Sequence, residues 1–501
     1  MAGSSSASGP RAAVPSARPL VAARVFSAAI TFVIPLALAR LLSLDHYGTF
    51  KQFFLLSHTL YFALAMGIPQ SLYYFLPRSE GADRKAYLGQ TLVYLIAGGV
   101  VAGCTLFGAT PILRWVGGDA LLAARLPIAL YCALLLGGGA LEAGLTAQGR
   151  PGSAAIAYFA SDTVKMISYV VPALLGKGLE GVLWGAVCYA AARTLGSWIV
   201  LALPLPGPLV RRALVPGQVR YALPYGGAML LGMPQQQLHQ YVVSVSSTPA
   251  VFAVYSVGCF NLPIVDLLYT PTTELLMYRM GELDRLGRPA SESAELFREA
   301  SANLAFVFLP IAAGLWVIAP QFLAFLYGPK FVDAAPIMRI ALGMVALASL
   351  PLDGVLRARD RTRQLFFAYV AKLGFTVPLV LGLAHALGPL GAMLGFVSAE
   401  ACHKLVLLAL AARALLPERA KAGWLKGTLL AIPGALPLRH VARAAGAAFA
   451  AALLAWSAQQ MIEMPPLYAV LVLGTAFWVA YALALAAVGM RPAALLERLR
   501  A

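Results

Sequence analysis

Five basic residues that lie deep inside long apolar segments are the part of this sequence best suited to chemistry. They are Arg24, Lys165, Arg193, Lys372 and Lys404. A charge at the centre of a membrane-spanning helix costs about 2.5–3.5 kcal/mol on insertion scales, so each of these residues needs a counter-charge, water or a ligand. Cations also bind phosphate through strong, charge-assisted hydrogen bonds. We therefore take the five residues as candidate ligands of an anionic substrate.

Carboxylates occur in the same apolar segments and offer an alternative use for these cations. Asp162 and Lys165 are three residues apart, and Glu400 and Lys404 are four apart. Side chains at these spacings meet on one face of a helix, so both pairs could be structural ion pairs. Structural pairing and substrate contact stay equally open for them. Arg24, Arg193 and Lys372 have no acidic residue at such a spacing, which favours a water-filled central cavity for these three.

Four further titratable residues are candidates for gating or ion coupling: Glu142, Asp353, Asp266 and His58. Glu142 and Asp353 occupy the same position in two related parts of the chain, each shortly before a basic loop. They could lock an inward gate by pairing with Arg150, Arg357 or Arg361, or they could anchor the ends of the loops. Asp266 lies between Pro263 and Pro271, where a helix is expected to bend. Coupling to protons, to sodium or to the membrane potential all remain open.

Uncharged polar residues form a third candidate group in the segment 221–245. Tyr225, Gln236 and Gln240 fall near one face of the expected helix. Amides and aromatic rings on one face suit the hydroxyl groups of a glycan or a water-lined gate. Hydrogen bonding between neighbouring helices is the alternative for such residues.

The segments that must position these residues are long and apolar. Hydrophobic residues make up 60% of the chain and charged residues 12%, against about 25% charged residues in average proteins. A helix needs roughly 20 apolar residues to cross a bilayer. By this measure the sequence contains about fourteen transmembrane spans, at 20–42, 53–76, 88–107, 121–147, 154–175, 181–203, 221–245, 250–277, 302–326, 335–356, 364–386, 390–412, 442–462 and 466–489.

The distribution of basic residues predicts the orientation of these spans. With the N-terminus in the cytoplasm, twenty-six of the 38 lysines and arginines fall in cytoplasmic segments and four in the opposite loops. This bias favours a bacterial inner membrane protein with both termini in the cytoplasm. The net charge of +17 then reflects topology, and we expect no binding to nucleic acid.

An internal repeat divides the predicted spans into two groups. Residues 125–185 resemble residues 335–395: Leu141-Glu142-Ala143-Gly144-Leu145 aligns with Leu352-Asp353-Gly354-Val355-Leu356, and Gly185 aligns with Gly395. We therefore expect an all-α membrane protein with two pseudo-symmetric six-helix lobes in the same orientation. Such parallel repeats place a substrate site between the lobes. The expected parts are a tail (1–19), a first lobe (20–203), a linker (204–220), a second lobe (221–412), a cytoplasmic loop (413–441), a helix pair (442–489) and a tail (490–501).

The motifs of enzymes and metalloproteins are missing from the sequence. The 5 cysteines and 6 histidines show no metal-ligand spacing. No nucleotide-binding, serine hydrolase or zinc protease motif occurs. We therefore expect no catalytic residues, no metal and no cofactor, and a monomer in the bilayer.

A family resemblance rests on the stretch from Phe32 to Arg78. It contains Ala39-Arg40-Leu41-Leu42, Tyr47-Gly48, Gly67-Ile68-Pro69-Gln70 and Phe75-Leu76-Pro77-Arg78. These resemble the opening of bacterial polysaccharide flippases, the Wzx-like O-antigen and exopolysaccharide exporters of the multidrug/oligosaccharidyl-lipid/polysaccharide superfamily. The resemblance implies a two-lobed fold like that of the superfamily's multidrug (MATE) transporters. It also implies transport of undecaprenyl-diphosphate-linked oligosaccharides to the periplasmic leaflet, with polymerase and chain-length proteins as partners and the cavity cations meeting the diphosphate.

Three other functions compete with this one. A lipid II flippase would use the same polyprenyl diphosphate chemistry. A drug/cation antiporter of the superfamily typically carries an acidic residue in its first span, where this chain has Arg24. A membrane glycosyltransferase or polymerase usually has a large periplasmic loop, whereas the loops expected here are short.

Overall fold

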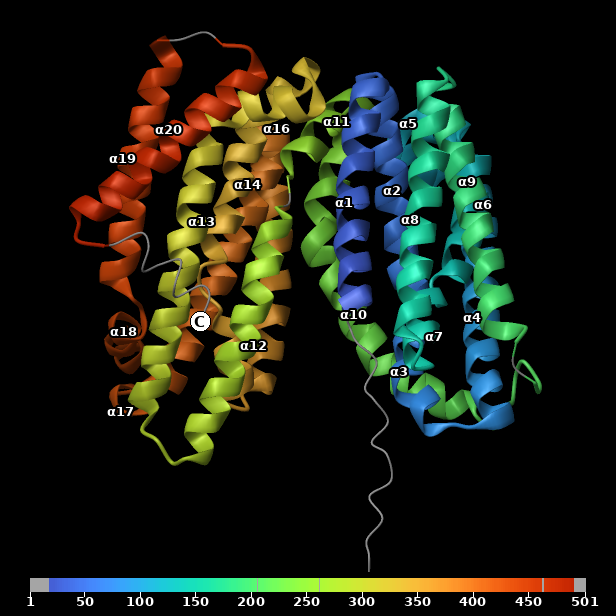
Figure 1. Ribbon diagram of the computed structural model, residues 1–501, viewed down its shortest axis with the longest axis horizontal. Helices are drawn as coiled ribbons and strands as arrows, with labels where there is room; N and C mark the ends of the chain where they lie inside the picture. Colours follow the sequence, from blue (N-terminus) through green and yellow to red (C-terminus); the bar gives the residue numbers. More distant parts are fainter. Residues whose placement is uncertain (1–17, 205, 261, 462–463, 491–501) are drawn as a thin grey trace, which may run out of the picture. The chain divides into compact units, whose positions relative to one another are not determined.

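All elements in the described part of the chain are helices (Figure 1). The computed structural model describes residues 18–204, 206–260, 262–461 and 464–490, with side chains from residue 23 on except those of Arg24 and Val25. The prediction of an all-α membrane protein is confirmed. The chain divides into two compact units, one of Met1–Leu42 and Leu56–Gly232 and one of Ser43–Leu55 and Met233–Ala501. Of the three boundaries, one precedes α2 (Leu44–Ala65), one falls inside α2 and one falls inside α10 (Val215–Ser246).

Unit 1 is built around pairs of long helices. α1 packs on α8, α4 packs on α6, and α9 packs on both α6 and α8. Leu72, Leu88, Leu136 and Leu201 belong to its buried core. Besides its parts of α2 and α10, unit 1 contains α1 (Arg18–Leu41), α3 (Ile68–Phe75), η1 (Leu76–Arg78), α4 (Gly81–Gly108), α5 (Thr110–Ala123), α6 (Arg125–Leu135), η2 (Leu136–Gly138), α7 (Leu141–Ala147), α8 (Pro151–Leu174), α9 (Gly178–Ser197) and η3 (Trp198–Ala202).

Unit 2 is organised around its two longest helices, α13 and α16. The helix pair α19–α20 packs along α13, as Figure 1 shows in red beside yellow. Besides its parts of α2 and α10, unit 2 contains α11 (Pro249–Gly258), α12 (Pro263–Arg285), α13 (Ala290–Tyr327), η4 (Pro329–Ala334), α14 (Ala335–Leu347), α15 (Leu352–Ala358), α16 (Thr362–Leu415), α17 (Pro417–Ala420), α18 (Trp424–Ala435), α19 (Leu438–Met461) and α20 (Pro466–Ala487).

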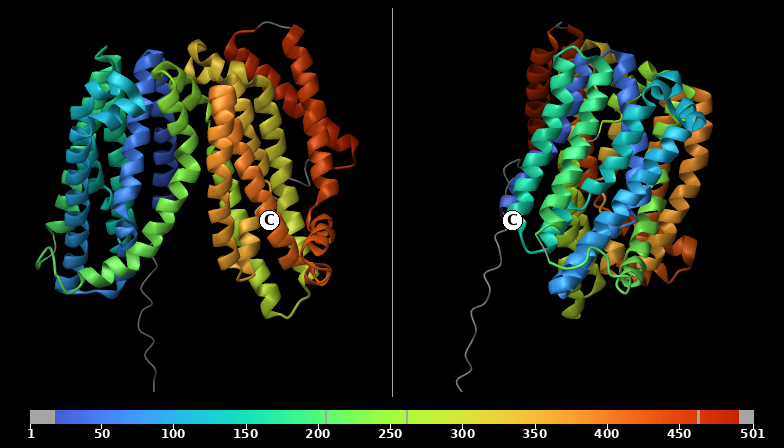
Figure 2. Two further views of the ribbon diagram at one scale, coloured as in Figure 1. Left: turned by 180° about the vertical axis from the view of Figure 1, so that it is seen from behind. Right: turned by 90° about the vertical axis from the view of Figure 1, so that its right-hand side faces the viewer.

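The structure shows a multi-pass membrane protein, but the expected count of fourteen spans is not confirmed. In the described residues, eight helices are long and apolar enough to cross a bilayer, or ten if each of two bent pairs is one span. α16 covers two expected spans, because its 54 residues bend at Gly388, where φ is 59°. Its two arms then run back alongside each other, visible in orange in Figure 2.

Two expected spans are interrupted at equivalent positions of the repeat. In unit 1 the helix breaks between α6 and α7, at residues 136–140, and in unit 2 between α14 and α15, at residues 348–351. A break leaves backbone carbonyl groups without their intrahelical partners, so other donors must satisfy them. Arg193 and Lys404 donate hydrogen bonds to carbonyl groups at these breaks.

Two segments expected to be connections between spans contain packed structure. The segment 204–220 includes the start of α10, where the Gln218 side chain is buried. Gln218 Nε2 donates to Ser71 Oγ at 2.8 Å and to Thr91 Oγ1 at 2.9 Å, and Gln218 Oε1 accepts from Gln90 Nε2 at 2.5 Å. The segment 413–441 includes α17 and α18, and α18 packs on α16.

The glycines aligned by the repeat allow close helix packing in both units. A methyl group at Gly185 would overlap the carbonyl oxygen of Ser168 on α8. A methyl group at Gly395 would lie 2.5 Å from the carbonyl oxygen of Leu379 on the other arm of α16. The repeat therefore preserves a backbone contact between two antiparallel helices.

We predict that Gly185→Ala and Gly395→Ala each destabilise the protein by roughly 1–3 kcal/mol, because the added methyl forces packed helices apart. Gly196→Ala is the control, since this α9 glycine has no atom within 4 Å of the added methyl. Thermal unfolding of the purified protein in detergent measures the effect. Equal melting temperatures for Gly185→Ala and Gly196→Ala would contradict the close contact.

Candidate functional site

Unit 2 contains a partly open cavity of about 490 Å³, lined by all the predicted site residues of that unit. Its walls come from α10, α12, α14, α15 and both arms of α16. Six residues expected from the sequence to serve the site line it: Gln236, Gln240, Asp266, Asp353, Lys372 and Lys404. The cavity thus holds two lysines beside several carboxylates and amides.

Lys372 is neutralised by Glu400 across the bend of α16. Lys372 Nζ lies 2.5 Å from Glu400 Oε2, and the two side chains are 13% and 12% exposed. Lys372 has no acidic residue at helical spacing, and its partner comes from the other arm of the helix. Pairing of Glu400 with Lys404 was one of two open alternatives, and Glu400 pairs with Lys372 instead. The bend at Gly388 makes the arms antiparallel, so residues 28 positions apart along the chain face each other.

Lys404 binds the broken helix between α14 and α15. Its Nζ donates to the carbonyl oxygen of Leu350 at 3.0 Å and lies 5.4 Å from the centre of the Tyr269 ring. Asp353 accepts hydrogen bonds from the Tyr269 hydroxyl and from Arg357. The expected contact between Asp353 and Arg357 is confirmed. Lys404, Tyr269 and Asp353 therefore form one polar group at the start of α15.

Two histidines in the cavity were not recognised as site residues from the sequence. His239 Nδ1 lies 2.7 Å from the Tyr255 hydroxyl. The His403 ring packs at 4.9 Å from that of Tyr369, and its Nδ1 has no hydrogen-bond partner among the described residues. The available signal was helical spacing, because His403 lies one turn after Glu400 and His239 adjoins Gln240.

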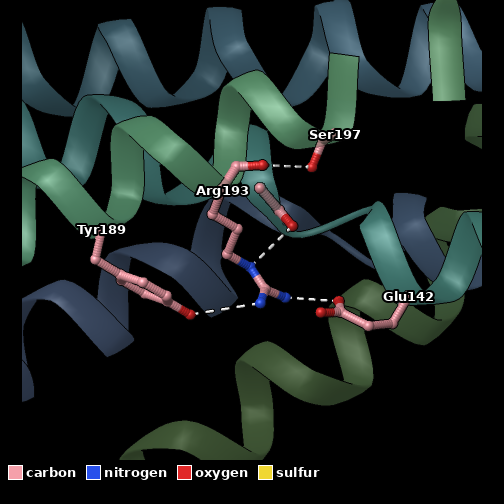
Figure 3. Close-up of polar contacts among 5 residues, drawn as sticks. Glu142, Tyr189, Arg193 and Ser197 are labelled. Carbon is pink, nitrogen blue, oxygen red and sulfur yellow. Dashed lines mark hydrogen bonds and ion pairs between the residues drawn. The ribbon is translucent and has the colours of Figure 1, made fainter. Parts of the chain in front are cut away.

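In unit 1 a second buried ion pair joins Arg193 to Glu142 (Figure 3). Arg193 Nη2 lies 2.6 Å from Glu142 Oε2, with side chains 17% and 7% exposed. Arg193 Nε also donates to the Gly138 carbonyl at 3.1 Å, and Nη1 to the Tyr189 hydroxyl at 3.4 Å. Arg193 has no acidic residue at helical spacing, and its partner is distant in sequence, because the break before α7 brings Glu142 next to α9. Glu142 consequently pairs with Arg193 and not with Arg150.

The Arg193 and Lys404 clusters are equivalent in the repeat. Lys404 follows Arg193 by the same 211 positions that separate Asp353 from Glu142. Each cation donates to a backbone carbonyl freed by the helix break, that of Gly138 or that of Leu350. Both cations therefore act first as clamps on an interrupted helix.

The remaining predicted residues of unit 1 do not join one site. Lys165 is half-buried on α8. Asp162, its possible partner, is buried, and Asp162 Oδ2 has no hydrogen-bond partner among the described residues. Tyr225 is exposed beside Gly67, and His58 lies on α2. Arg24 lies on α1, and its side chain is outside the described part. In that part, no group of three or more His, Cys, Asp or Glu residues could hold a metal ion.

Comparison with known proteins identifies the family. The family described as "Polysaccharide biosynthesis protein" matches residues 37–336, more than half of the chain. The chain belongs to this polysaccharide biosynthesis family. No curated protein matches the sequence.

Solved structures share the fold of this polysaccharide biosynthesis protein at low sequence identity. The lipid II flippase MurJ in an inward closed conformation has a TM-score of 0.70 at 12% identity, covering 93% of this chain and 97% of MurJ. An inward-facing MATE family multidrug transporter of the MOP superfamily has a TM-score of 0.62 at 12% identity, covering 81% of this chain and all of the transporter. The resemblance expected from the Phe32–Arg78 stretch is confirmed for family and fold.

We predict that Arg193→Met destabilises the protein by roughly 3–5 kcal/mol, because it leaves Glu142 buried without a counter-charge. The double variant Glu142→Gln/Arg193→Met should recover much of this loss, since it buries no charge. Arg114→Met removes an exposed partner of Asp119 and should cost less than about 1 kcal/mol. Thermal unfolding in detergent compares the unmodified protein with these three variants. A double variant that melts no higher than Arg193→Met would contradict the stabilising role of the Arg193–Glu142 pair.

Proposed function

We propose that this protein is a flippase that moves undecaprenyl-diphosphate-linked oligosaccharides from the cytoplasmic to the periplasmic leaflet of the bacterial inner membrane. The glycan would serve O-antigen, capsule or exopolysaccharide synthesis. Membership of the polysaccharide biosynthesis family and the fold of MurJ and MATE transporters support this proposal. Movement would follow by alternating access of two lobes, as in other transporters built from repeats.

The observation that carries the proposal is the Lys372–Glu400 pair in a cavity that also presents Gln236 and Gln240. A diphosphate can replace Glu400 as the partner of Lys372 and keep a charge-assisted hydrogen bond on the ammonium group. The two amides can bind the hydroxyl groups of the first sugar. The prenyl chain needs no polar site, because it can stay in the bilayer.

The same exchange gives a reason for ion coupling. When an anion binds Lys372, Glu400 loses its paired cation, and a largely buried carboxylate without a counter-charge is costly unless it is neutralised. A proton or a sodium ion on Glu400 removes that cost. His403 and Lys404 lie on the same arm of α16 one turn further on and share the cavity. We therefore propose that substrate binding and ion binding meet at Glu400.

The first test is depletion of the protein in its native host, followed by analysis of the lipid-linked species in the cytoplasmic leaflet. We expect undecaprenyl-diphosphate oligosaccharide to accumulate and surface polysaccharide to disappear. Accumulation of lipid II with cell lysis would assign the protein to peptidoglycan precursor export instead. Sensitivity to cationic drugs without either lipid accumulating would favour a drug/cation antiporter.

The role of Lys372 is tested by variants that leave no unpaired charge at the Lys372–Glu400 position. We predict that Lys372→Gln/Glu400→Gln reduces export by roughly 10- to 100-fold, the loss of one hydrogen bond to a charged group. Lys372→Arg should retain export, because it keeps the cation. Lys421→Ala is the control, since Lys421 pairs with Glu418 at an exposed position. Surface polysaccharide, normalised to protein in the membrane, is the readout. Normal export by the double variant would show that Lys372 does not bind the substrate.

A further inference from the structure

An apolar groove lies between α12 and α13, separate from the polar cavity of unit 2. Its volume is about 470 Å³. On α12 the residues Leu267, Pro271 and Leu275 line it at intervals of one helical turn, and on α13 so do Leu296, Ala300 and Leu304. Two facing stripes of this kind form a channel parallel to the helices. The groove therefore suits an extended hydrocarbon chain.

Two side chains of opposite charge line the half of this groove nearest the turn between α12 and α13. They are Arg279 on α12 and Glu299 on α13, and Asn303 lines the groove one helical turn further along α13. Both are exposed, and neither forms an ion pair within the described residues. By contrast, Arg288 in the turn itself is paired with Glu292 at 3.6 Å. The end of the groove thus presents one cation and one anion, both available to a ligand.

The length of the groove fits one leaflet of a bilayer. From Leu268 to Arg279 the helix rises about 17 Å at 1.5 Å per residue. Half of the hydrocarbon core is about 15 Å thick. The charged end lies in the segment 278–301, which the distribution of basic residues assigns to the cytoplasmic side. An acyl chain along the leucine stripes would therefore bring its headgroup to Arg279 and Glu299.

We propose that this groove is a binding site for a zwitterionic phospholipid of the phosphatidylethanolamine class. The lipid phosphate accepts hydrogen bonds from the Arg279 guanidinium, and the ethanolamine ammonium donates to the Glu299 carboxylate. One acyl chain fills the groove between α12 and α13. An anionic phospholipid fits less well, because Glu299 repels a headgroup that has no cation. A polyprenyl diphosphate meets the same obstacle. The site is independent of the proposed transport activity.

The test uses the full-length protein in vesicles of equal parts phosphatidylethanolamine and phosphatidylglycerol. Each lipid in turn carries a photoreactive diazirine on one acyl chain, and labelled peptides are mapped by mass spectrometry. We expect phosphatidylethanolamine to label α12 and α13 more than phosphatidylglycerol does. Glu299→Gln should lower this preference about two- to fivefold, as expected for one partly exposed ion pair.

Matched controls are available on α12. Glu282 and Arg285 are exposed and do not line the groove, so Glu282→Gln and Arg285→Gln should leave labelling unchanged. Arg279→Gln should weaken labelling by both lipids, because both carry a phosphate. Equal labelling by the two lipids in the unmodified protein would overturn the proposal. So would displacement of the phosphatidylethanolamine label by undecaprenyl phosphate at equal concentration, which would assign the groove to a prenyl chain.

Discussion

The need to neutralise charge inside an apolar fold governs the arrangement of polar residues in both units. A buried ion costs several kcal/mol unless it is paired and its remaining hydrogen-bonding groups are satisfied. Arg193 meets both conditions, since it binds Glu142 and the Gly138 carbonyl. The carbonyl is available because the helix breaks at residues 136–140. The break and the cation therefore depend on each other: the break provides an acceptor for the charge, and the charge satisfies the backbone of the break.

The repeat has kept this arrangement while changing what surrounds it. In unit 1 the guanidinium of Arg193 spreads its donors over a carboxylate, a carbonyl and a hydroxyl. In unit 2 the equivalent Lys404 is a single ammonium group with one carbonyl and an aromatic ring close by. Unit 2 adds a second cation, Lys372, with its own partner Glu400. The cavity of unit 2 therefore contains a cation whose charge partner is a single carboxylate on the other arm of α16.

The sequence was sufficient for the all-α class and for several helix faces, but not for the breaks and bends within spans or for the contacts between helices. Helical spacing placed Lys372, Glu400 and Lys404 on polar stripes, and the cavity contains all three. The same spacing suggested Glu400 with Lys404, because periodicity compares only neighbours on one helix. The actual partner of Glu400 is set by the bend at Gly388, which brings together residues far apart along the chain. Likewise, the break before α7 brings Glu142 close to Arg193, which is far from it along the chain.

The paired state of Lys372 has a consequence for the proposed transport cycle. A bare lysine in a low-dielectric cavity would attract any small anion, because the field of an uncompensated charge is strong there. With Glu400 at 2.5 Å, the ammonium charge of Lys372 is compensated, so it attracts phosphate or chloride less than a bare lysine would. A ligand must then gain enough from several contacts at once to displace Glu400, and a diphosphate attached to a sugar can do so through Lys372, Gln236 and Gln240. In the proposed cycle, the ion pair would therefore favour ligands that combine charge with a polar glycan, as the proposed lipid-linked oligosaccharide does.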